Sequence, residues 1–371
     1  MKELYYIFYD VGWGSGILKK IDMHINFFSK HFLNVEKIAI QRECNKLLRL
    51  LKKFFPLASE YKLNILDNVR NGSVVYIRYN GSCFKLINKL RLLKKKKCLI
   101  YVEIPTYPYY NEYSFLDKIL NYKEILTHHL LKLYVDKIIT YSRDEIIFGI
   151  KTINVSNCID FERISKNSFS KEKKSLVSEI HSIAVAAFSK WHGYDRVIEG
   201  MKKYYDNNPK VKFYFHLVGD GKELSKYENM INKYKLSQYV LIHGKLIGSE
   251  LDKIYEKMDL GFDALGRHRS GVLYNSSLKG KEYLAKGLPI VSGVNTELDF
   301  FKPKLPFYIR VPANDTAIDI DYIIKSIVNL NSQENFEDKI RFFAEKNFDI
   351  NVVYKKIYLD MNYLYYNGRD K

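Results

Sequence analysis

Short apolar runs alternate along the chain with longer segments in which apolar residues recur at helical spacing. Segments such as Lys19–Phe32 and Lys222–Lys235 show the helical pattern. Strands that alternate with helices are typical of parallel sheets covered by helices on both faces. The apolar runs predict strands at Leu4–Phe8, Val35–Ile40, Val74–Arg78, Cys98–Val102, Lys137–Tyr141, Thr152–Val155, Ile183–Ala187, Phe213–Val218, Tyr239–His243, Leu260–Ala264 and Ile290–Gly293.

A polar stretch interrupts this alternation at residues 161–178, which read FERISKNSFSKEKKSLVS. We interpret it as the connection between two domains, which a chain of 371 residues also leads us to expect. The prediction is an N-terminal Rossmann-like domain over residues 1–165 and a C-terminal one over residues 166–347. A terminal helical segment over residues 348–371 is expected to pack toward the N-terminal domain. In doubly wound sheets, ligands bind beyond the carboxyl ends of the strands, so candidate chemistry is sought there.

The charge balance narrows the range of partners. Sixty Lys and Arg against 42 Asp and Glu give a net charge of +18, which attracts nucleic acid, anionic lipid or phosphorylated ligands. No nucleic-acid recognition motif is present, so nucleic acid is not expected. Residues 45–55 and 84–97 combine basic and apolar positions, as do helices on anionic membrane surfaces, although ordinary solvated helices have the same pattern.

Other features favour a cytoplasmic protein. No apolar run approaches the ~20 residues of a membrane span, and the N-terminus lacks a signal-peptide core. The four cysteines show no metal-ligand spacing, which is typical of free thiols in a reducing compartment.

The segment from Ser276 to Gly293, SSLKGKEYLAKGLPIVSG, has the clearest local signals. Ser276 or Ser277 is a favoured N-cap, and a short helix over residues 278–286 would follow. Gly287 suits the left-handed position after a helix, and the proline two residues later prevents its continuation.

The start of this helix carries a cation and an acid. A helix N-terminus offers free N–H groups and positive partial charge to a phosphate. Lys279 lies in the first turn, and Glu282 shares its face of the helix. Together they suit a diphosphate and a ribose, although a surface ion pair on a packing helix remains the alternative.

This segment occurs with three others in a defined order. They are Asn157-Cys158-Ile159-Asp160, Val218-Gly219-Asp220-Gly221 and the stretch Ser249–Leu265. In this order and spacing the four segments resemble family-four (group 1) glycosyltransferases, including bacterial surface-polysaccharide transferases. The resemblance is specific from about Lys137 to Gly293. It implies the α/β GT-B fold: two Rossmann-like doubly wound domains facing across a cleft, with a C-terminal helix crossing back.

The resemblance also implies roles for individual residues. Glu282 corresponds to the family acid that binds the donor ribose, and the family's other acid falls at Tyr274. The family's arginine and lysine that grip the diphosphate fall at Ala187 and His192, so other cations would have to supply the charge. The cations that could do so are Arg267, Arg269 and Lys279. Backbone amides facing the sugar and phosphate are expected from Asn275, Ser276, Ser277 and Leu278.

Further candidates follow other predicted strands. In the resembling family, the loop that corresponds to Gly14, Ser15 and Gly16 approaches the donor phosphate and the acceptor. The alternative is that this loop is only a tight turn between a strand and a helix. Glu103 could orient an acceptor hydroxyl or cap a neighbouring loop. The set expected to take part in catalysis is Lys279, His192 and Glu103. The remaining donor contacts are expected from Gly219, Gly244, Lys245 and Leu246.

These features together predict a glycosyltransferase, and the family resemblance implies that it retains the donor's anomeric configuration. It would move a sugar from a nucleotide-diphosphate sugar to a glycan or lipid-linked acceptor in capsule, exopolysaccharide or O-antigen synthesis. No metal and no cofactor are expected, because the candidate phosphate site is made of cations and amides. The expected location is the cytoplasm, with the inner face of the membrane as a peripheral site. The alternative is a non-catalytic nucleotide-sugar-binding partner of a transferase complex.

Overall fold

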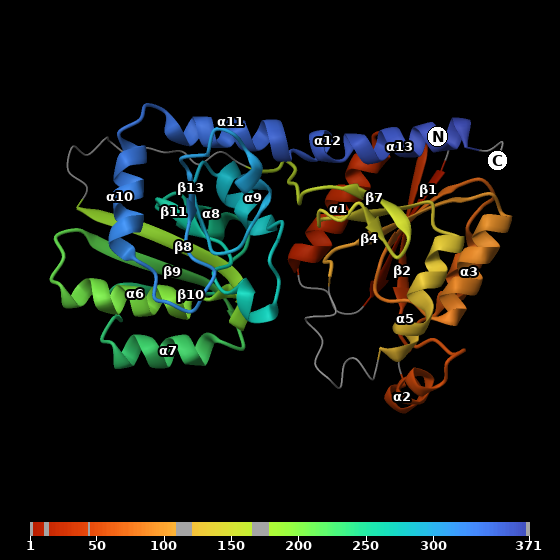
Figure 1. The fold of residues 1–371 in the computed structure, drawn as a ribbon, viewed down its shortest axis with the longest axis horizontal. Helices are drawn as coiled ribbons and strands as arrows, with labels where there is room; N and C mark the ends of the chain where they lie inside the picture. The colour runs from red at the N-terminus through yellow and green to blue at the C-terminus, as the bar shows by residue number, and fades with distance from the viewer. Residues whose placement is uncertain (1–2, 11–14, 44, 109–120, 165–177, 369–371) are drawn as a thin grey trace. The chain divides into compact units, whose positions relative to one another are not determined.

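The computed structural model describes residues 3–10, 15–43, 45–108, 121–164 and 178–368. The chain forms two compact units, of which the first comprises residues 1–156 and 350–371 and the second residues 157–349. Each unit is built around one sheet and its own helices (Figure 1). Most of the polar stretch predicted to connect the domains, residues 165–177, lies outside the described residues.

The first unit contains a seven-stranded sheet in the order β2-β1-β3-β4-β5-β7-β6. All neighbouring strands pair in parallel except β6 and β7. The order reverses between β1 and β3, so the carboxyl ends of these two strands form the topological switch point. The strands are β1 Glu3–Asp10, β2 Asn34–Gln41, β3 Val74–Arg78, β4 Leu99–Ile104, β5 Lys137–Thr140, β6 Ile146–Ile147 and β7 Ile150–Asn154.

Helices from both ends of the chain complete the first unit. The returning C-terminal segment is fixed by hydrogen bonds to it: Tyr101 Oη donates to Asp360 Oδ1 (2.7 Å), and Tyr354 Oη lies 3.0 Å from Tyr141 Oη. Ile357 and Met361, one turn apart, are fully buried. The helices are α1 Ser15–Ser29, α2 Lys46–Phe54, η1 Leu63–Asn68, α3 Phe84–Lys95, α5 Tyr122–Thr127, η3 His128–Leu133, α12 Ile350–Val353 and α13 Lys355–Asn367.

The second unit has an all-parallel six-stranded sheet in the order β10-β9-β8-β11-β12-β13. Renumbered within the unit, this is the doubly wound order 3-2-1-4-5-6, whose switch point lies between β8 and β11. The strands are β8 Glu179–Phe188, β9 Lys212–Gly221, β10 Val240–Gly244, β11 Leu260–Phe262, β12 Ile290–Ser292 and β13 Tyr308–Arg310.

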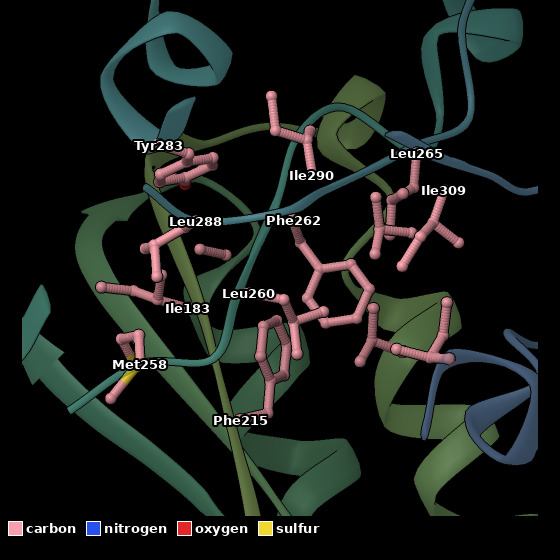
Figure 2. Packing of buried hydrophobic residues seen from close by; sticks show 14 of the residues in the cluster. Ile183, Phe215, Met258, Leu260, Phe262, Leu265, Tyr283, Leu288, Ile290 and Ile309 are labelled. Carbon is pink, nitrogen blue, oxygen red and sulfur yellow. The ribbon is translucent and has the colours of Figure 1, made fainter. Parts of the chain in front are cut away.

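The core of the second unit joins the sheet to the helices on it. Phe215 and Phe262 pack edge to face at 5.4 Å, and Tyr283 lies against the same cluster (Figure 2). The Tyr283 hydroxyl accepts a hydrogen bond from Val185 N (2.9 Å), which ties α9 to β8. The helices are η4 Lys190–His192, α6 Asp195–Asp206, α7 Leu224–Lys233, α8 Ser249–Tyr255, η5 Arg267–Ser270, α9 Leu278–Ala285, η6 Glu297–Phe300, α10 Ile320–Asn331 and α11 Phe336–Phe348.

The structure confirms the predicted two-sheet α/β fold and corrects one local detail. The sequence reading placed Gly219 after a strand, but β9 continues through Gly221 because β8 and β9 stay paired up to Phe188. Gly219 has φ +135°, and a Cβ there would lie 1.9 Å from the Ala186 carbonyl oxygen. The glycine therefore allows the close approach of two strands. None of the described helices is both long and apolar enough to cross a bilayer.

Candidate functional site

The start of α9 is built as the sequence predicts. Ser277 is the N-cap, and its Oγ accepts a hydrogen bond from Gly280 N (3.2 Å). The helix ends at Ala285, and Gly287 has the left-handed conformation expected after it (φ +77°). The N–H groups of Leu278 and Lys279 precede the first intrahelical hydrogen bond, so they can bind an anion.

Buried polar groups hold this helix start in place. Ser277 Oγ also donates to Asp263 Oδ1 (2.6 Å), and Asp263 is the first residue after β11. Ser276 is engaged within the same unit: its Oγ accepts from Asn157 N (2.7 Å) and donates to Glu297 Oε1 (3.1 Å). Ser276 therefore supports the helix start through its side chain.

Lys279 is the central cation of the switch point between β8 and β11. Its Nζ donates to Tyr194 Oη (3.3 Å) and lies 5.8 Å from the centre of the Tyr194 ring. Burial lowers the pKa of Lys279 to about 8, with Asp263 opposing the shift and Arg267 adding to it. The side chain is half-buried, so this cation is partly desolvated and remains accessible from one side.

His192 lies beside the same tyrosine as a neutral hydrogen-bond donor. Its ring stacks on Tyr194 with 5.4 Å between centroids and 11° between planes. Burial lowers its pKa to about 2, and the Lys279 and Arg267 cations add to the shift. Ser189 N donates to Nδ1 (3.1 Å), so the neutral ring carries its proton on Nε2. His192 can therefore donate a hydrogen bond to a phosphate or sugar without adding charge.

The two candidate arginines differ in their surroundings. Arg267 stands over the Trp191 ring at 5.7 Å and is close enough to affect the pKa of both His192 and Lys279. Arg269 is instead paired with Asp195 (2.9 Å) and Asp315 (2.7 Å). Within the described structure Arg267 thus belongs to the switch-point cluster, while Arg269 binds two carboxylates of its own unit.

Two loops meet closely at this site, which explains how its side chains are positioned. Leu265 N donates to His192 O (2.8 Å) and Gly266 N donates to Trp191 O (3.2 Å). Gly193 has φ +66°, and a Cβ there would lie 2.6 Å from Gly266 N. The close approach of these two loops places η4, which follows β8, against the segment that follows β11.

The other predicted donor contacts lie around this cluster. Glu282 is half-buried on α9 and is close enough to raise the pKa of Lys279. The Tyr274 ring lies 6.3 Å from that of Phe300, and the backbone of Asn275 donates to Asn295 O (2.9 Å).

On the far side of β8, the carboxyl ends of β9 and β10 hold the remaining candidates of this unit. Lys245 Nζ, directly after β10, lies 3.2 Å from Asp220 Oδ2. Gly244 has φ +67° and ends the strand, and Leu246 packs against the core of the unit.

The candidates of the first unit have a different setting. Ser15 and Gly16 begin α1, whereas Gly14 lies outside the described residues. Glu103, near the end of β4, is fully buried and accepts hydrogen bonds from Arg78 Nη1 (2.5 Å) and Tyr76 Oη (2.9 Å).

Glu103 is the centre of a buried charge network. Burial alone would raise its pKa, but Arg78 and Lys20 outweigh burial and lower the pKa to about 2. Lys20 Nζ lies 3.7 Å from the carboxylate. In this structure the Glu103 carboxylate serves the interior of the unit; a role toward the acceptor stays a prediction.

Sequence reasoning missed Asp263 and Tyr194, which organise the switch point. The predicted strand Leu260–Ala264 included Asp263, whereas β11 ends at Phe262 and leaves Asp263 at the carboxyl edge of the sheet. An acidic residue at the end of an apolar run was the available signal. Among the described residues, no group of three or more His, Cys, Asp or Glu side chains is arranged to hold a metal ion.

Comparison with known proteins identifies a family model that matches part of the second unit. Residues 164–262 match the family model described as "Glycosyl transferases group 1". This match ends before α9, so the α9 site rests on its geometry and on the resemblance of its sequence. No curated protein sequence matches the chain.

Solved structures are similar over nearly the whole chain. Sucrose-phosphate synthase from Thermosynechococcus elongatus has a TM-score of 0.65 at 12% identity and covers 99% of both chains. Anabaena HepE, solved in complex with UDP and glucose, has a TM-score of 0.64 at 12% identity and covers 96% of this chain and 99% of its own. The lipopolysaccharide outer core galactosyltransferase WaaB has a TM-score of 0.61 at 13% identity and covers 98% of this chain and 100% of its own. At these identities the similarity establishes the GT-B fold. The family model of the group 1 glycosyltransferases matches a segment of the second unit, residues 164–262.

Proposed function

We propose that this chain is a retaining glycosyltransferase that transfers a sugar from a nucleotide-diphosphate sugar. The observation that supports this most is the cluster at the switch point between β8 and β11. Lys279 and Arg267 supply positive charge, His192 supplies a neutral donor, and the first turn of α9 supplies backbone N–H groups. Departure of a nucleotide diphosphate builds up negative charge, which donors fixed in advance stabilise.

The related structures agree with this choice of donor. HepE is described in complex with UDP and glucose and also with UDP-glucose, which shows that this fold holds a nucleotide sugar in that protein. For this chain we propose Glu282 as the partner of the ribose hydroxyls. Metal-free catalysis is proposed because the cluster presents cations where a divalent ion would otherwise neutralise the leaving group.

The acceptor is proposed to be a lipid-linked glycan of a capsule, exopolysaccharide or O-antigen pathway in a bacterium. The enzyme would then act in the cytoplasm, at the inner face of the membrane. This choice of acceptor is supported by the structural similarity to WaaB, which is described as a lipopolysaccharide outer core galactosyltransferase.

Ligand-induced stabilisation tests the donor directly. Thermal unfolding of the purified protein would be followed with a panel of nucleotide-diphosphate sugars, alongside the same sugars without nucleotide. A cognate donor at a hundredfold excess over Kd adds about 2.7 kcal/mol to the free energy of unfolding. No stabilisation by any nucleotide or nucleotide sugar would contradict the proposal.

Product analysis then tests the reaction. NMR of the product should show the donor's anomeric configuration, with equal rates in the presence and absence of EDTA. An inverted product would contradict retention, and activity lost in EDTA and restored by magnesium would contradict metal-free catalysis.

A second candidate is a non-catalytic nucleotide-sugar-binding partner. It is favoured by Tyr274 and Ala187, which stand where the resembling family has an acid and an arginine. Binding of a nucleotide sugar without turnover, in the presence of acceptor extracts that support a related transferase, would favour this candidate. Turnover of any nucleotide sugar to a glycosylated product would exclude it.

A further inference from the structure

Helix α2 presents an apolar face to the surface of the first unit. Leu47, Leu51 and Phe54 recur at i, i+4 and i+7, so they lie on one side of the helix. Their side chains are 68%, 48% and 57% exposed, and the two apolar residues that follow the helix, Phe55 and Leu57, are 62% and 77% exposed. A continuous run of large exposed apolar side chains marks an interaction surface.

Cations line the opposite side of the same helix. Lys46, Arg49 and Lys53 recur at i, i+3 and i+7, roughly opposite the apolar row. Lys52 is paired with Glu43 (2.7 Å), whereas these three cations make no ion pair with a carboxylate of the described residues. The first turn of α2 contains no acidic residue either. This combination is typical of helices that lie in the plane of an anionic lipid surface.

The other basic stretch of the first unit does not have such a face. In α3 the apolar residues Leu86, Ile87, Leu90 and Leu93 are buried in the core of the unit. Residues 84–97 therefore lack the exposed apolar row that a membrane-surface helix needs, because these side chains pack into the fold. Of the basic residues of α3, Arg91 and Lys95 are exposed, whereas Lys89 and Lys94 are paired with carboxylates.

A second element extends the apolar surface of α2. Tyr122 Oη, at the start of α5, donates to Phe54 O (2.8 Å), and Lys123 Nζ donates to Ala58 O (2.8 Å). Ile125 and Leu126 on α5 are about half exposed. Figure 1 shows α5 and α2 next to each other at one end of the first unit. The hydrogen bonds hold α2 on the rest of the unit as a fixed platform.

A cavity opens beside the basic side of α2. It has a volume of about 650 Å³ and lies at the switch point between β1 and β3, where Tyr9 and Tyr79 line it. Lys52 and Lys53 of α2 form part of the same wall. A membrane that α2 contacts would therefore lie near this cavity.

We propose that α2, together with Phe55 and Leu57, is the surface by which this protein docks onto an anionic lipid bilayer. The apolar row would enter the boundary between headgroups and acyl chains, while Lys46, Arg49 and Lys53 contact lipid phosphates. The cavity at β1 and β3 would then receive polar groups that project from the membrane. This last consequence rests on the proposed transferase function, whereas the docking surface does not.

Vesicle flotation tests the docking surface independently of any activity. The full-length protein would be mixed with vesicles of neutral phosphatidylcholine, or of phosphatidylcholine with a third phosphatidylglycerol. Binding is expected to the anionic vesicles and to fall as salt rises, because screening weakens the attraction. Replacing Lys46 and Arg49 by Gln should weaken binding by about fivefold per cation. The same change at Arg91 and Lys95 of α3 removes equal charge and should matter much less.

Insertion of the apolar face needs a separate measurement. Leu51→Trp is expected to show a blue-shifted tryptophan emission on anionic vesicles, whereas Phe342→Trp on α11, where the native side chain is 67% exposed, should show no shift. The triple variant Leu47→Ser, Leu51→Ser, Phe54→Ser should lose flotation, and its far-UV spectrum and thermal unfolding would check its fold.

Several outcomes would overturn the proposal. Equal binding to neutral and anionic vesicles, absence of binding, or unchanged flotation of the triple variant would each do so. Concentration-dependent self-association that the triple variant abolishes, with no vesicle binding, would assign the surface to a protein partner instead. If the wild-type protein turns over nucleotide sugar but does not bind vesicles, the docking surface is refuted and the proposed function is not affected.

Discussion

The pH dependence of donor use should report the charge of Lys279. Its pKa is lowered to about 8 by burial, with Arg267 adding to the effect. A lysine with a lowered pKa is charged below that value and loses its charge as pH rises through it. If the cation stabilises the leaving diphosphate, activity should be full near pH 7 and fall on the alkaline side.

The size of the effect follows from the pKa. One unit above the pKa, at pH 9, about one lysine in ten remains protonated. The ratio kcat/KM reports the free enzyme, so it should fall about tenfold for each pH unit above 8. The decrease of kcat on the alkaline side should begin at a higher pH than the decrease of kcat/KM, because a bound diphosphate favours the charged lysine.

This profile would be measured from initial rates between pH 6 and 10, at donor concentrations from well below to well above KM. Lys279→Arg keeps a cation at all these values, so its alkaline limb should disappear even if its rate is lower. Lys279→Met should have low activity throughout. Below pH 8 the wild-type protein buries a charged lysine, which lowers its free energy of unfolding. Methionine carries no charge, so the Lys279→Met variant should unfold at or above the wild-type temperature at pH 7. A flat wild-type profile to pH 9.5, or the same limb in the Arg variant, would refute the assignment.

Three further predictions concern other residues of the two units. Glu282→Ala should weaken donor binding by ten- to hundredfold, about 1.5–3 kcal/mol, in calorimetric titration, while Glu250→Ala on the exposed start of α8 should not. Gly219→Ala should lower the free energy of unfolding in urea by more than 2 kcal/mol, roughly, because its Cβ would lie 1.9 Å from a carbonyl oxygen of β8. Gly244→Ala, with φ +67° and open space, should cost only about 1–2 kcal/mol; equal losses would contradict this packing argument. Glu103→Gln should destabilise the first unit by about 3–5 kcal/mol at pH 7, because it leaves buried cations unpaired. The lowered pKa of Glu103 means that the difference from wild type should shrink as pH falls from about 4.5 toward 2, and a constant difference would refute it.

The sequence was sufficient for most strands of the sheets because each forms a short apolar run, and the central strands β1, β3 and β4 are buried along most of their length. Every predicted strand has a counterpart, and Val74–Arg78 coincides with β3. The two strands that were missed lack a readable pattern. β6 has only two residues, and β13 is a three-residue strand, Tyr308–Arg310, that contains a single fully buried side chain.

The ends of α9 were predictable for a related reason. Ser277 and Gly287 act through local backbone geometry, which a few adjacent residues determine. The pairing of Arg269 with Asp195 and Asp315 could not be read in this way, because these carboxylates lie far from it in the sequence. Only the folded chain distinguishes this arginine from Arg267.

Helices α2 and α3 differ in whether their apolar residues are exposed or buried, and the sequence does not predict this difference. Both segments are basic, apolar and helical, so their composition predicts the same surface for both. The outcome depends on what the rest of the unit places against each helix: α3 packs on η1 and β4, whereas the apolar row of α2 stays exposed. Sequence patterns predict that a helix is amphipathic, but its tertiary neighbours decide whether the apolar face becomes core or interface.

Ala187 stands where the resembling family has an arginine, and we expect other cations of the site to take over the role of that arginine. Ala187 lies near the end of β8 with an exposed side chain, and the remaining positive charge comes from Arg267 and Lys279 on the β11 side. Lys279 should therefore carry more of the leaving-group charge than it would beside an arginine. It follows that Ala187→Arg should restore part of the turnover of Lys279→Met, by about tenfold if one charge-assisted hydrogen bond is regained. The neighbouring Asp220 is already bonded to Lys245 (3.2 Å), which limits its competition for the new arginine. The measurement is kcat of the double variant against the single one at saturating donor, with Ala187→Gln in the same background as the uncharged control. Equal rates for the arginine and glutamine versions would show that the diphosphate does not reach the end of β8, and the donor would then have to be placed closer to α9.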